Sequence, residues 1–451
     1  MHRQNSVIRG IQDLCEEFRR YNQIDAKLYE KFDVKRGLRN QDGTGVMAGL
    51  TQICNVHGYI INEGEREPVE GSLYYRGYDV KELVGHCVEA RRFGFEEVVY
   101  LLIFGVLPTE EQLAGLKRIL SHFCYLPEGF FEDMMLKAPS ANIMNKLARS
   151  ILALYSYDKD PDNLSLESEI GRALQIIARL GNIAVKAYQV KRRFFDGKTM
   201  FLHPEQPGLS FSEEMLSLLR GDRIYTQDEA LLLDLCLMIH AEHGGGNNST
   251  FACRVLTSSH TDAYSAYASA VGALKGPLHG GANLQVMRML SDMKEHVSDI
   301  TNEGEVADYL QKLLNKEGFD RSGKIYGMGH AVYTLSDPRA AILKKYASGY
   351  AAGTEFEKDF KALNLIESLT PELMAKKGIT KPICANIDLY TGTVYRMLDI
   401  PEDLFTPLFA TARIAGWSAH RIEELFTGNR IIRPAYKAVA KPRAYVPIDQ
   451  R

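Results

Sequence analysis

The residues that suggest chemistry begin with a histidine on a predicted sharp bend. His279 lies in the run Gly-Pro-Leu-His-Gly-Gly-Ala-Asn at positions 276–283, between two helix-forming sequences of this 451-residue chain. The Gly-Pro pair ends the first helix, because proline has no N–H and disfavours helical dihedrals in the residue before it. The Gly-Gly pair lets the backbone turn and lets another group approach closely. His279 is therefore expected at a helix junction whose N–H groups can face an anion, although an incidental histidine also fits such a corner.

A second stretch, His240–Thr250, closes a predicted helix and joins two histidines to three consecutive glycines. His240 and His243 share a helix face, an arrangement that metal sites use. The zinc-protease motif needs i, i+4 spacing, which is absent here, and neither a GxGxxG turn nor a P-loop accompanies the glycines. We therefore predict no metal in this stretch. Three glycines followed by polar residues indicate close contact with a small ligand.

A third stretch, Tyr326–Arg339, again places a histidine, His330, after flexible glycines. A helix is expected to begin near Asp337-Pro338, with aspartate as the cap and proline at the first position. Arg339 then falls in the first turn, where the helix dipole disfavours a positive side chain. A residue placed against local preference often has a binding task. The alternative is an internal salt bridge with Asp337.

Two charged residues lie in apolar surroundings near the end of the chain. Asp388 stands between isoleucine and leucine, and desolvation there would raise its pKa and make it a stronger base. The alternative is a simple cap for the helix that follows. Arg413 falls in an apolar helix, where an unpaired guanidinium would cost several kcal/mol. Arg413 should therefore have an anionic partner, either a ligand or an internal carboxylate.

The composition narrows the class of protein. With 45% hydrophobic and 25% charged residues and a net charge of −3, the chain is typical of a globular protein, and it gives no reason to expect nucleic acid or a membrane surface as partner. Seven scattered cysteines without a CxxC predict reduced thiols and no zinc site. The longest apolar run is too short to span a bilayer. The N-terminus carries acids within a helical pattern, unlike a secretory or transit peptide, so we predict a cytoplasmic location.

The periodicity of the apolar residues predicts a mainly α fold. Small antiparallel β pieces are expected near 51–78, where β-branched and aromatic residues flank a turn-like Asn-Glu-Gly. Residues 1–40 read as one or two amphipathic helices. From residue 79 onward nearly every segment has a 3.6-residue apolar period, and no strand–helix alternation indicates a doubly wound sheet.

Together these stretches resemble the citrate synthase family. The resemblance begins near the run Glu-Gly-Ser-Leu-Tyr-Tyr-Arg-Gly-Tyr at positions 70–78 and continues to Arg433. It implies a mainly helical fold with a large domain, residues 1–280 and 387–451, and a small closing domain, residues 281–386. It also implies condensation of acetyl-CoA with oxaloacetate to give citrate and CoA, with acetyl-CoA as co-substrate and neither a metal nor a permanently bound cofactor.

The resemblance also implies a role for individual residues. Asp388 would remove a proton from the acetyl methyl group, His279 would stabilise the enolate, and His330 would polarise and protonate the ketone of oxaloacetate. The residues implied to contact oxaloacetate are His243, Asn247, Arg339, Arg413 and Arg433. Those implied to contact CoA are Gly327, Lys381 and Asn386. In the family the last of the arginines comes from the partner subunit, which implies a homodimer with a shared active site, and domain closure would assemble that site.

Three alternatives remain at this stage. A 2-methylcitrate synthase would use propionyl-CoA with the same residues, and one methylene in an apolar pocket is worth only about 1–3 kcal/mol. A non-catalytic relative serving as a binding protein is disfavoured because the two histidines and the aspartate are all present. An ATP-dependent lyase would need a nucleotide-binding module, for which the sequence has no P-loop. The helical pattern of residues 1–45 differs from the longer β-rich segment linked to hexamers and NADH control in some relatives, and it predicts a dimer without that control.

Overall fold

The β-rich stretch folds as an antiparallel hairpin. In the computed structural model, which describes residues 2–379, 381–428 and 430–451, strand β1 (Cys54–Asn62) pairs with β2 (Glu65–Tyr75), and the short β3 (Tyr78–Asp79) adds to β2. The connecting turn uses Gly64 at a φ of +87°, in the left-handed region that glycine occupies without strain. The small β pieces predicted near 51–78 are confirmed.

The chain divides into two compact units, which are described separately. One contains residues 1–49 and 432–451, and the other residues 50–431. The first unit contains α1 (His2–Tyr21), α2 (Lys27–Lys31) and two short 3-10 turns, Arg36–Leu38 and Ile448–Gln450. Within it, the ammonium of Lys437 lies 5.6 Å from the centre of the Phe32 ring. The helical character predicted for residues 1–40 is confirmed.

The second unit is built almost entirely of helices, so the mainly α prediction is confirmed. Several begin with a side-chain cap, for example the capping boxes Thr109–Gln112, Ser210–Glu213 and Thr226–Glu229, which satisfy the first free N–H groups. The helices before the predicted small domain are α3 (Val80–Glu89), α4 (Phe95–Phe104), α5 (Glu110–Phe123), α6 (Ile143–Leu154), α7 (Leu166–Phe194), α8 (Phe211–Leu219), α9 (Gln227–His240), α10 (Asn248–Thr257) and α11 (Ala263–Lys275).

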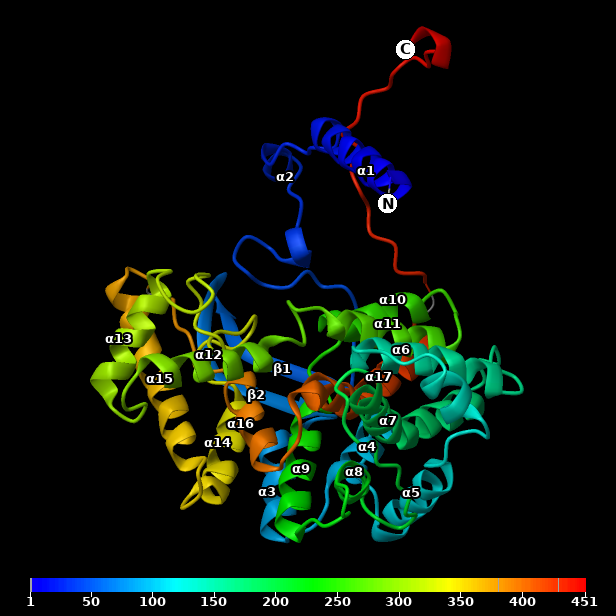
Figure 1. Cartoon of the computed structure of the whole chain (residues 1–451), viewed down its shortest axis with the longest axis vertical. Coiled ribbons are helices and arrows are strands. Elements are labelled where there is room, and N and C mark those ends of the chain that lie inside the picture. Colours follow the sequence, from blue (N-terminus) through cyan, green and yellow to red (C-terminus); the bar gives the residue numbers. More distant parts are fainter. Residues whose placement is uncertain (1, 380, 429) are drawn as a thin grey trace. The chain divides into compact units, whose positions relative to one another are not determined.

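Helices α12 (Ala282–His296), α13 (Glu303–Leu314), α14 (Pro338–Ala351) and α15 (Glu357–Lys376) gather on the left side of this unit in Figure 1. The chain then returns through α16 (Asp388–Met397), which packs against α12, α14 and α15. These helices cover most of residues 281–386. Their division from the rest as a small closing domain stays a prediction.

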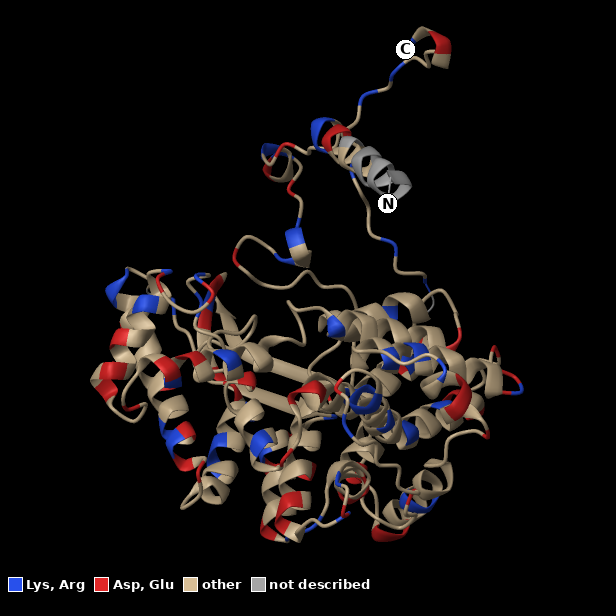
Figure 2. Cartoon of the chain, viewed as in Figure 1, with Lys and Arg blue, Asp and Glu red and all other residues tan. Residues whose placement is uncertain are grey.

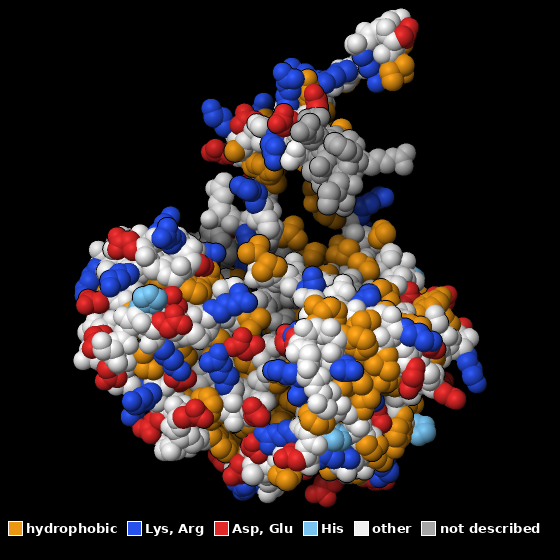
Figure 3. All heavy atoms as spheres, viewed as in Figure 1, with side chains coloured by type: hydrophobic (Ala, Val, Ile, Leu, Met, Phe, Trp, Pro, Cys, Tyr) orange, Lys and Arg blue, Asp and Glu red, His pale blue; other side chains and the backbone are white. Residues whose placement is uncertain are grey.

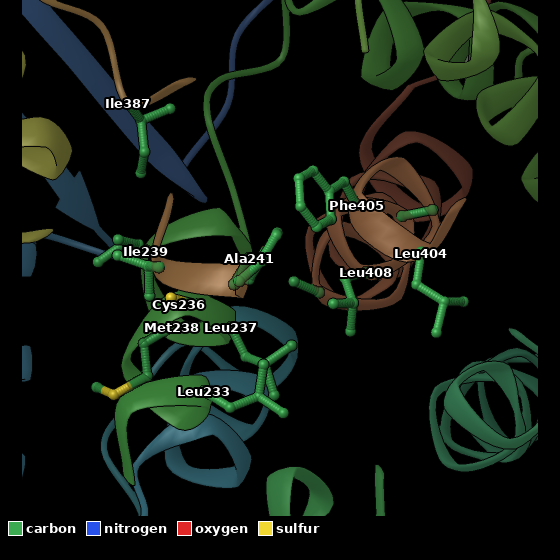
Figure 4. Close-up of a cluster of buried hydrophobic side chains, with 14 of the residues drawn as sticks. Leu233, Cys236, Leu237, Met238, Ile239, Ala241, Ile387, Leu404, Phe405 and Leu408 are labelled. Carbon is green, nitrogen blue, oxygen red and sulfur yellow. The ribbon is translucent and has the colours of Figure 1, made fainter. Parts of the chain in front are cut away.

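The core of the second unit is organised around α17 (Phe405–Thr427), which packs against α4, α7, α9, α10 and α11. In Figure 4, Phe405 and Leu408 of α17, together with Leu404 of the preceding 3-10 turn Glu402–Leu404, lie opposite the apolar side chains of α9. Further along, the N–H of Gly416 donates to the carbonyl of Ala241 over 3.2 Å. A Cβ at position 416 would lie 2.6 Å from that carbonyl oxygen, so only glycine allows the two backbones to approach so closely.

Charged side chains of both signs are interspersed along the helices of this unit (Figure 2), as the totals of 54 basic and 57 acidic residues lead one to expect. Over the described residues, the helices lack a stretch both long and apolar enough to cross a bilayer.

A buried ion pair ties α17 to α7 and gives a test of the packing. Arg421 donates to both carboxylate oxygens of Glu169, over 2.7 and 3.0 Å, and neither side chain is exposed. Removing one partner of a buried pair leaves an uncompensated charge, so Glu169→Leu should lower the free energy of unfolding by about 3–5 kcal/mol. Urea denaturation measures the change, and Glu169→Leu/Arg421→Met should recover most of it. A loss below about 1 kcal/mol would show that Thr257 and the Thr261 carbonyl, which Arg421 also contacts, suffice for the guanidinium.

Candidate active site

Two segments distant in sequence are joined by backbone hydrogen bonds at the centre of the site. The N–H of Gly329 donates to the carbonyl of Cys384 over 2.7 Å, and the N–H of Asn386 donates to the carbonyl of Gly327 over 2.9 Å. The Asn386 side chain adds two bonds, donating to the Gly329 carbonyl over 2.8 Å and accepting from the N–H of Asp388 over 3.0 Å. The loop that carries His330 is therefore fixed against the start of α16, where Asp388 lies.

The protonation of His330 follows from its neighbours. Its Nδ1 accepts the N–H groups of Val332 and Tyr333, each over 3.1 Å. Because an accepting ring nitrogen carries no proton, the neutral ring has its proton on Nε2. The ring stacks on Tyr333, with centroids 4.7 Å apart, and meets the edge of His243 at 5.1 Å. His330 is thus oriented as a hydrogen-bond donor.

His243 is buried and neutral. Burial holds its pKa well below the usual range, and the positive charge of Arg339 and the neighbouring His330 lower it further. Its Nε2 has no hydrogen-bond partner within the described residues. An orphaned buried polar atom calls for an explanation, and a bound ligand would supply one.

Arg339 forms the internal salt bridge that stood as the alternative in the sequence. Its Nε and Nη2 donate to the two oxygens of Asp337 over 3.0 and 2.7 Å, and Asp337 also caps α14 by accepting the backbone N–H of Arg339. Burial raises the pKa of Asp337, but Arg339 outweighs it and the net pKa is lowered. The positive side chain in the first turn is therefore offset by its own cap, while its charge still acts on His243.

Arg413 is a buried arginine whose two terminal Nη groups make no hydrogen bonds with the described residues. It is 0% exposed in α17, its Nε donates to the carbonyl of His240 over 2.7 Å, and its guanidinium lies 4.7 Å from the centre of the Phe409 ring. Neither Nη1 nor Nη2 has a hydrogen-bond partner among the residues described. Glu242 acts on it electrostatically without forming an ion pair. An anionic ligand would satisfy both Nη groups, as a fork of this shape binds a carboxylate.

Asp388 is a half-buried carboxyl group at the first position of α16. The N-cap position is held by Ile387 and Asp388 is the first helical residue, so the cap alternative does not describe Asp388. Burial raises its pKa to about 6, against an opposing effect of Arg339. The group therefore combines a base of useful strength with a position beside the His330 loop.

His279 occupies the predicted bend between α11 and α12. Its N–H donates to the Gly276 carbonyl over 2.9 Å, and a Cβ at Gly280 would lie 2.3 Å from the Leu274 carbonyl, so the glycine is required there. Burial, helped by the positive charge of Arg413, lowers the pKa of His279 to about 4. The imidazole is therefore neutral at pH 7, as a hydrogen-bond donor to a developing oxyanion can be.

Ser249 connects His279 to the rest of the site and was not identified from the sequence. Its hydroxyl lies 3.0 Å from Nε2 of His279, accepts from Nε1 of Trp417 over 3.2 Å and donates to Oδ1 of Asn247 over 2.9 Å. A hydroxyl has one hydrogen, which rotates to suit its neighbours. The only signal in the sequence was a serine three positions after Gly246, and this serine is the second residue of α10.

The remaining predicted residues have other surroundings. Gly327 has a φ of +83°, and a Cβ there would lie 2.9 Å from the Cα of Leu389, so packing alone requires glycine. Lys381 is exposed. Arg433 is exposed and belongs to the unit of residues 1–49 and 432–451. For Lys381 and Arg433, roles in binding stay predictions.

The histidine pair of the second stretch is not arranged as a metal site. Nδ1 of His240 lies 2.7 Å from the Cys236 carbonyl, and burial lowers the pKa of His240 to about 3. In the part of the chain that the structure describes, no three side chains of His, Cys, Asp or Glu are grouped to hold a metal ion.

Comparison with known proteins gives one family. Residues 40–435 match the family described as "Citrate synthase, C-terminal domain". The chain is 34% identical to 2-methylcitrate synthase 1 of Corynebacterium glutamicum, over 93% of this chain and 98% of the relative. It is 33% identical to the citrate synthase of Haloferax volcanii, over 93% of this chain and 99% of the relative.

Solved structures agree with the sequence comparison. The citrate synthase of Thermotoga maritima superposes with a TM-score of 0.72 at 30% identity, over 93% of this chain and 99% of that one. That of Thermoplasma acidophilum, solved as a ternary complex with carboxymethyl coenzyme A and oxaloacetate, gives 0.75 at 26% identity with the same coverage. The family match over residues 40–435, the similar sequences and the similar folds lead to one conclusion: this chain belongs to the citrate synthase family.

Proposed function

We propose that this chain is an acyltransferase that condenses acetyl-CoA with oxaloacetate to give citrate and CoA. The proposal rests on the presence of two groups in one site. Asp388 is a half-buried carboxyl group with a raised pKa, and Arg413 is a buried guanidinium whose Nη groups have no partner within the described residues. The first is a base for a weakly acidic C–H, and the second is a receptor for a carboxylate. A relative from Thermoplasma acidophilum was solved with a CoA analogue and oxaloacetate, which supports these two compounds as the ligands.

The first step makes a nucleophile from the acetyl group. Asp388 takes a proton from the methyl carbon, and the electron pair of the C–H bond moves toward the thioester oxygen. The Ser249 hydrogen, which Oδ1 of Asn247 accepts in this structure, must turn to Nε2 of His279 for the proton of that neutral ring to lie on Nδ1, from which it is donated to the developing oxyanion. One donor preorganised in this way is worth about 2.7–4 kcal/mol in the transition state.

The second step forms the carbon–carbon bond. The enolate carbon attacks the ketone carbon of oxaloacetate, and the Nε2–H of His330 donates to the ketone oxygen, which becomes a hydroxyl group as it takes the proton. Water then adds to the thioester carbonyl carbon and the C–S bond breaks, so the acyl carbon becomes a carboxylate of citrate and the sulfur leaves as the CoA thiol with one proton from the water. Asp388 releases its proton to solvent and His330 takes one back, which restores both groups. General acid–base groups in such positions contribute about 10²–10⁴-fold each. These reaction steps require neither a metal ion nor a permanently bound cofactor.

Oxaloacetate is held by the positive groups around His243. Arg413 offers two Nη groups, and the proposed partners around it are His243, Asn247, Arg339 and Arg433. A charge-assisted hydrogen bond contributes about 1.5–3 kcal/mol, and a lysine would lose the bidentate geometry. Gly327, Lys381 and Asn386 are the proposed contacts for CoA.

The active unit is proposed to be a homodimer in the cytoplasm, with Arg433 supplied by the partner subunit. Figure 3 shows hydrophobic side chains gathered on the face over α6 and α7. Leu152 of α6 and Leu166 of α7 are each 48% exposed. An apolar patch of this kind on a folded unit fits a second copy of the chain. The seven cysteines are free thiols, which agrees with a reducing compartment.

A second candidate function is 2-methylcitrate synthesis from propionyl-CoA. It is favoured by a specific observation: relatives named citrate synthase and 2-methylcitrate synthase are equally similar to this chain, at 33% and 34% identity. The residues and the chemistry would be the same, and only the acyl pocket would differ.

The reaction is tested by thiol release. We expect fast release of CoA from acetyl-CoA that requires oxaloacetate and continues in EDTA, because the proposed steps use only acid–base groups. Asp388→Asn should release no CoA while still binding oxaloacetate in calorimetry. A preference for propionyl-CoA would establish the second candidate, and no release from either thioester would overturn both.

The raised pKa of Asp388 predicts how stability depends on pH. The folded protein holds this proton up to about pH 6, whereas an unfolded aspartate releases it near its ordinary value of about 3.9. The folded state therefore binds more protons, and this group's contribution to stability falls as the pH rises from about 4 to about 6. Asp388→Asn should thus be more stable than the wild type at pH 7.5, by at most about 3 kcal/mol, with the difference vanishing near pH 4. Urea denaturation at several pH values decides; equal stabilities at pH 7.5 would contradict the raised pKa.

The shared site is tested by mixing two inactive variants. Asp388→Asn and Arg433→Ala homodimers should each be nearly inactive, the second through a raised KM for oxaloacetate. After subunit exchange, a heterodimer has one site with both substitutions and one intact site, so about one quarter of the sites should regain activity at equal mixing. Each variant mixed with itself is the control. If exchange is complete and no activity returns, Arg433 is not supplied by the partner.

A further inference from the structure

A buried carboxylate lies near Arg413 without pairing to it. Glu242 is 0% exposed, and its negative charge is the strongest influence that raises the pKa of the Arg413 guanidinium against the effect of burial. The two side chains nevertheless form no ion pair among the described residues. Oε2 of Glu242 and both Nη groups of Arg413 lack hydrogen-bond partners in this part of the chain. Two opposite buried charges that stay apart must be held apart, because their attraction is strong where water is excluded.

The group that holds Glu242 is His420. Nε2 of His420 lies 3.0 Å from Oε1 of Glu242, and the same oxygen accepts the N–H of Gly244. Burial raises the pKa of Glu242, but His420, Arg413 and the Gly244 N–H together bring it below the ordinary value, so the group is a carboxylate. Both contacts use Oε1 and turn the carboxylate toward His420.

Arg254 fixes the direction of this hydrogen bond. Its Nη2 and Nε lie 2.6 and 3.1 Å from Nδ1 of His420. A guanidinium can only donate, so Nδ1 must accept and the proton of the neutral imidazole lies on Nε2, facing Glu242. Arg254 is itself held by Glu424, over 2.7 Å, and by Glu423. The chain from Arg254 through His420 to Glu242 therefore has one consistent set of donors and acceptors.

Two glycines make room for this arrangement. A Cβ at Gly416 would lie 2.0 Å from Oε2 of Glu242, and a Cβ at Gly245 would lie 3.3 Å from Cε1 of His420. Gly416 thus serves both the close approach of α17 to the Ala241 carbonyl and the space for the unpaired carboxylate oxygen. Its absence of a side chain permits the position of Glu242 but does not fix it.

We propose that His420 is a positioning residue that holds Glu242 away from Arg413 and so keeps both Nη groups available to the carboxylate of the substrate. The inference rests on the proposed function in that Arg413 is taken as the substrate receptor. Without the Nε2–H of His420, Glu242 retains only one hydrogen bond and can turn toward Arg413. The Glu242 carboxylate then competes with the substrate carboxylate for the Nη groups of Arg413. The competition lowers the fraction of receptor that can bind, which raises the apparent Kd in proportion.

The test separates substrate binding from the chemical step. His420→Leu should raise the KM for oxaloacetate at least tenfold and change kcat less than threefold, because no group of the proposed chemistry is altered. His420→Gln should stay close to the wild-type KM, since its amide can donate to Glu242 and accept from Arg254. Adding Glu242→Gln to His420→Leu removes the competing charge and should restore the KM to within threefold. Thr411→Val, which alters a buried side chain of α17 bonded only to the Pro407 carbonyl, is the packing control.

Several results would overturn the inference. It fails if His420→Leu keeps the wild-type KM, if it lowers kcat as much as it raises KM, or if Glu242→Gln does not restore binding. Should His420→Leu not fold, Glu242→Gln alone decides: an unchanged or lower KM supports the proposal, and a tenfold higher KM contradicts it. Calorimetry of oxaloacetate binding separates the two proposals, because weaker binding to His420→Leu supports the role of His420 even if no acyl-CoA is turned over.

Discussion

The buried guanidinium of Arg413 is the constraint on which the rest of the site depends. A charge this deep is stabilised by the His240 carbonyl, the face of Phe409 and the nearby charge of Glu242, yet burial still lowers its pKa. Burial is the main cause of the lowered pKa of His240, His243 and His279 and of the raised pKa of Asp388, and the positive charge of Arg413 favours the neutral histidines and the ionised aspartate. Arg339 acts in the same direction on His240, His243 and Asp388, although it is paired with Asp337.

The precision of the site comes from backbone contacts more than from side-chain reach. The His330 loop is fixed by hydrogen bonds to residues 384–386, and α17 is fixed to the end of α9 by the Gly416 N–H. Gly327 and Gly416 are required at these contacts because a Cβ would collide with Leu389 or with the Ala241 carbonyl and Glu242, whereas Gly329 is favoured by its φ of +92°. Functional groups placed on such junctions move only if the helices move. Asp388 lies just beyond the predicted boundary of the small domain, and these hydrogen bonds would keep it beside His330 if that domain closed over the substrates.

Local patterns in the sequence predicted the elements and the bends well. The hairpin, the capped helices and the helix break before His279 all follow from residues close to one another in the chain, and the structure confirms them. The patterns also singled out Asp388 and Arg413 as charges in apolar runs. Burial raises the pKa of Asp388 as predicted, whereas the anionic partner predicted for Arg413 is not found among the described residues. For Arg339 the sequence left a salt bridge and a binding role open, and the structure contains the salt bridge.

The remaining features depend on contacts between distant segments, which no local pattern encodes. Trp417 bonds to Ser249, and His420 bonds to Glu242, across more than 160 positions. A serine beside a helix start, or a histidine in an apolar helix, has no special appearance in sequence. Asp388 shows the same limit in another form. Whether an aspartate at a helix start caps it or stands as a buried base depends on the packing around it, and only the three-dimensional arrangement distinguishes the two.

The charge states together indicate which group limits activity in acid. The pKa of His279 is about 4 and that of His243 is well below its usual range, so both rings are neutral through mildly acidic conditions. Asp388, with a pKa of about 6, is protonated first as the pH falls, and a protonated carboxyl group cannot accept the methyl proton. An arginine receptor keeps its charge over this whole range. The fall in reaction rate toward low pH should therefore follow the protonation of the Asp388 carboxyl group and not that of the histidines. This holds although imidazole is the group whose ordinary pKa lies nearest to that pH.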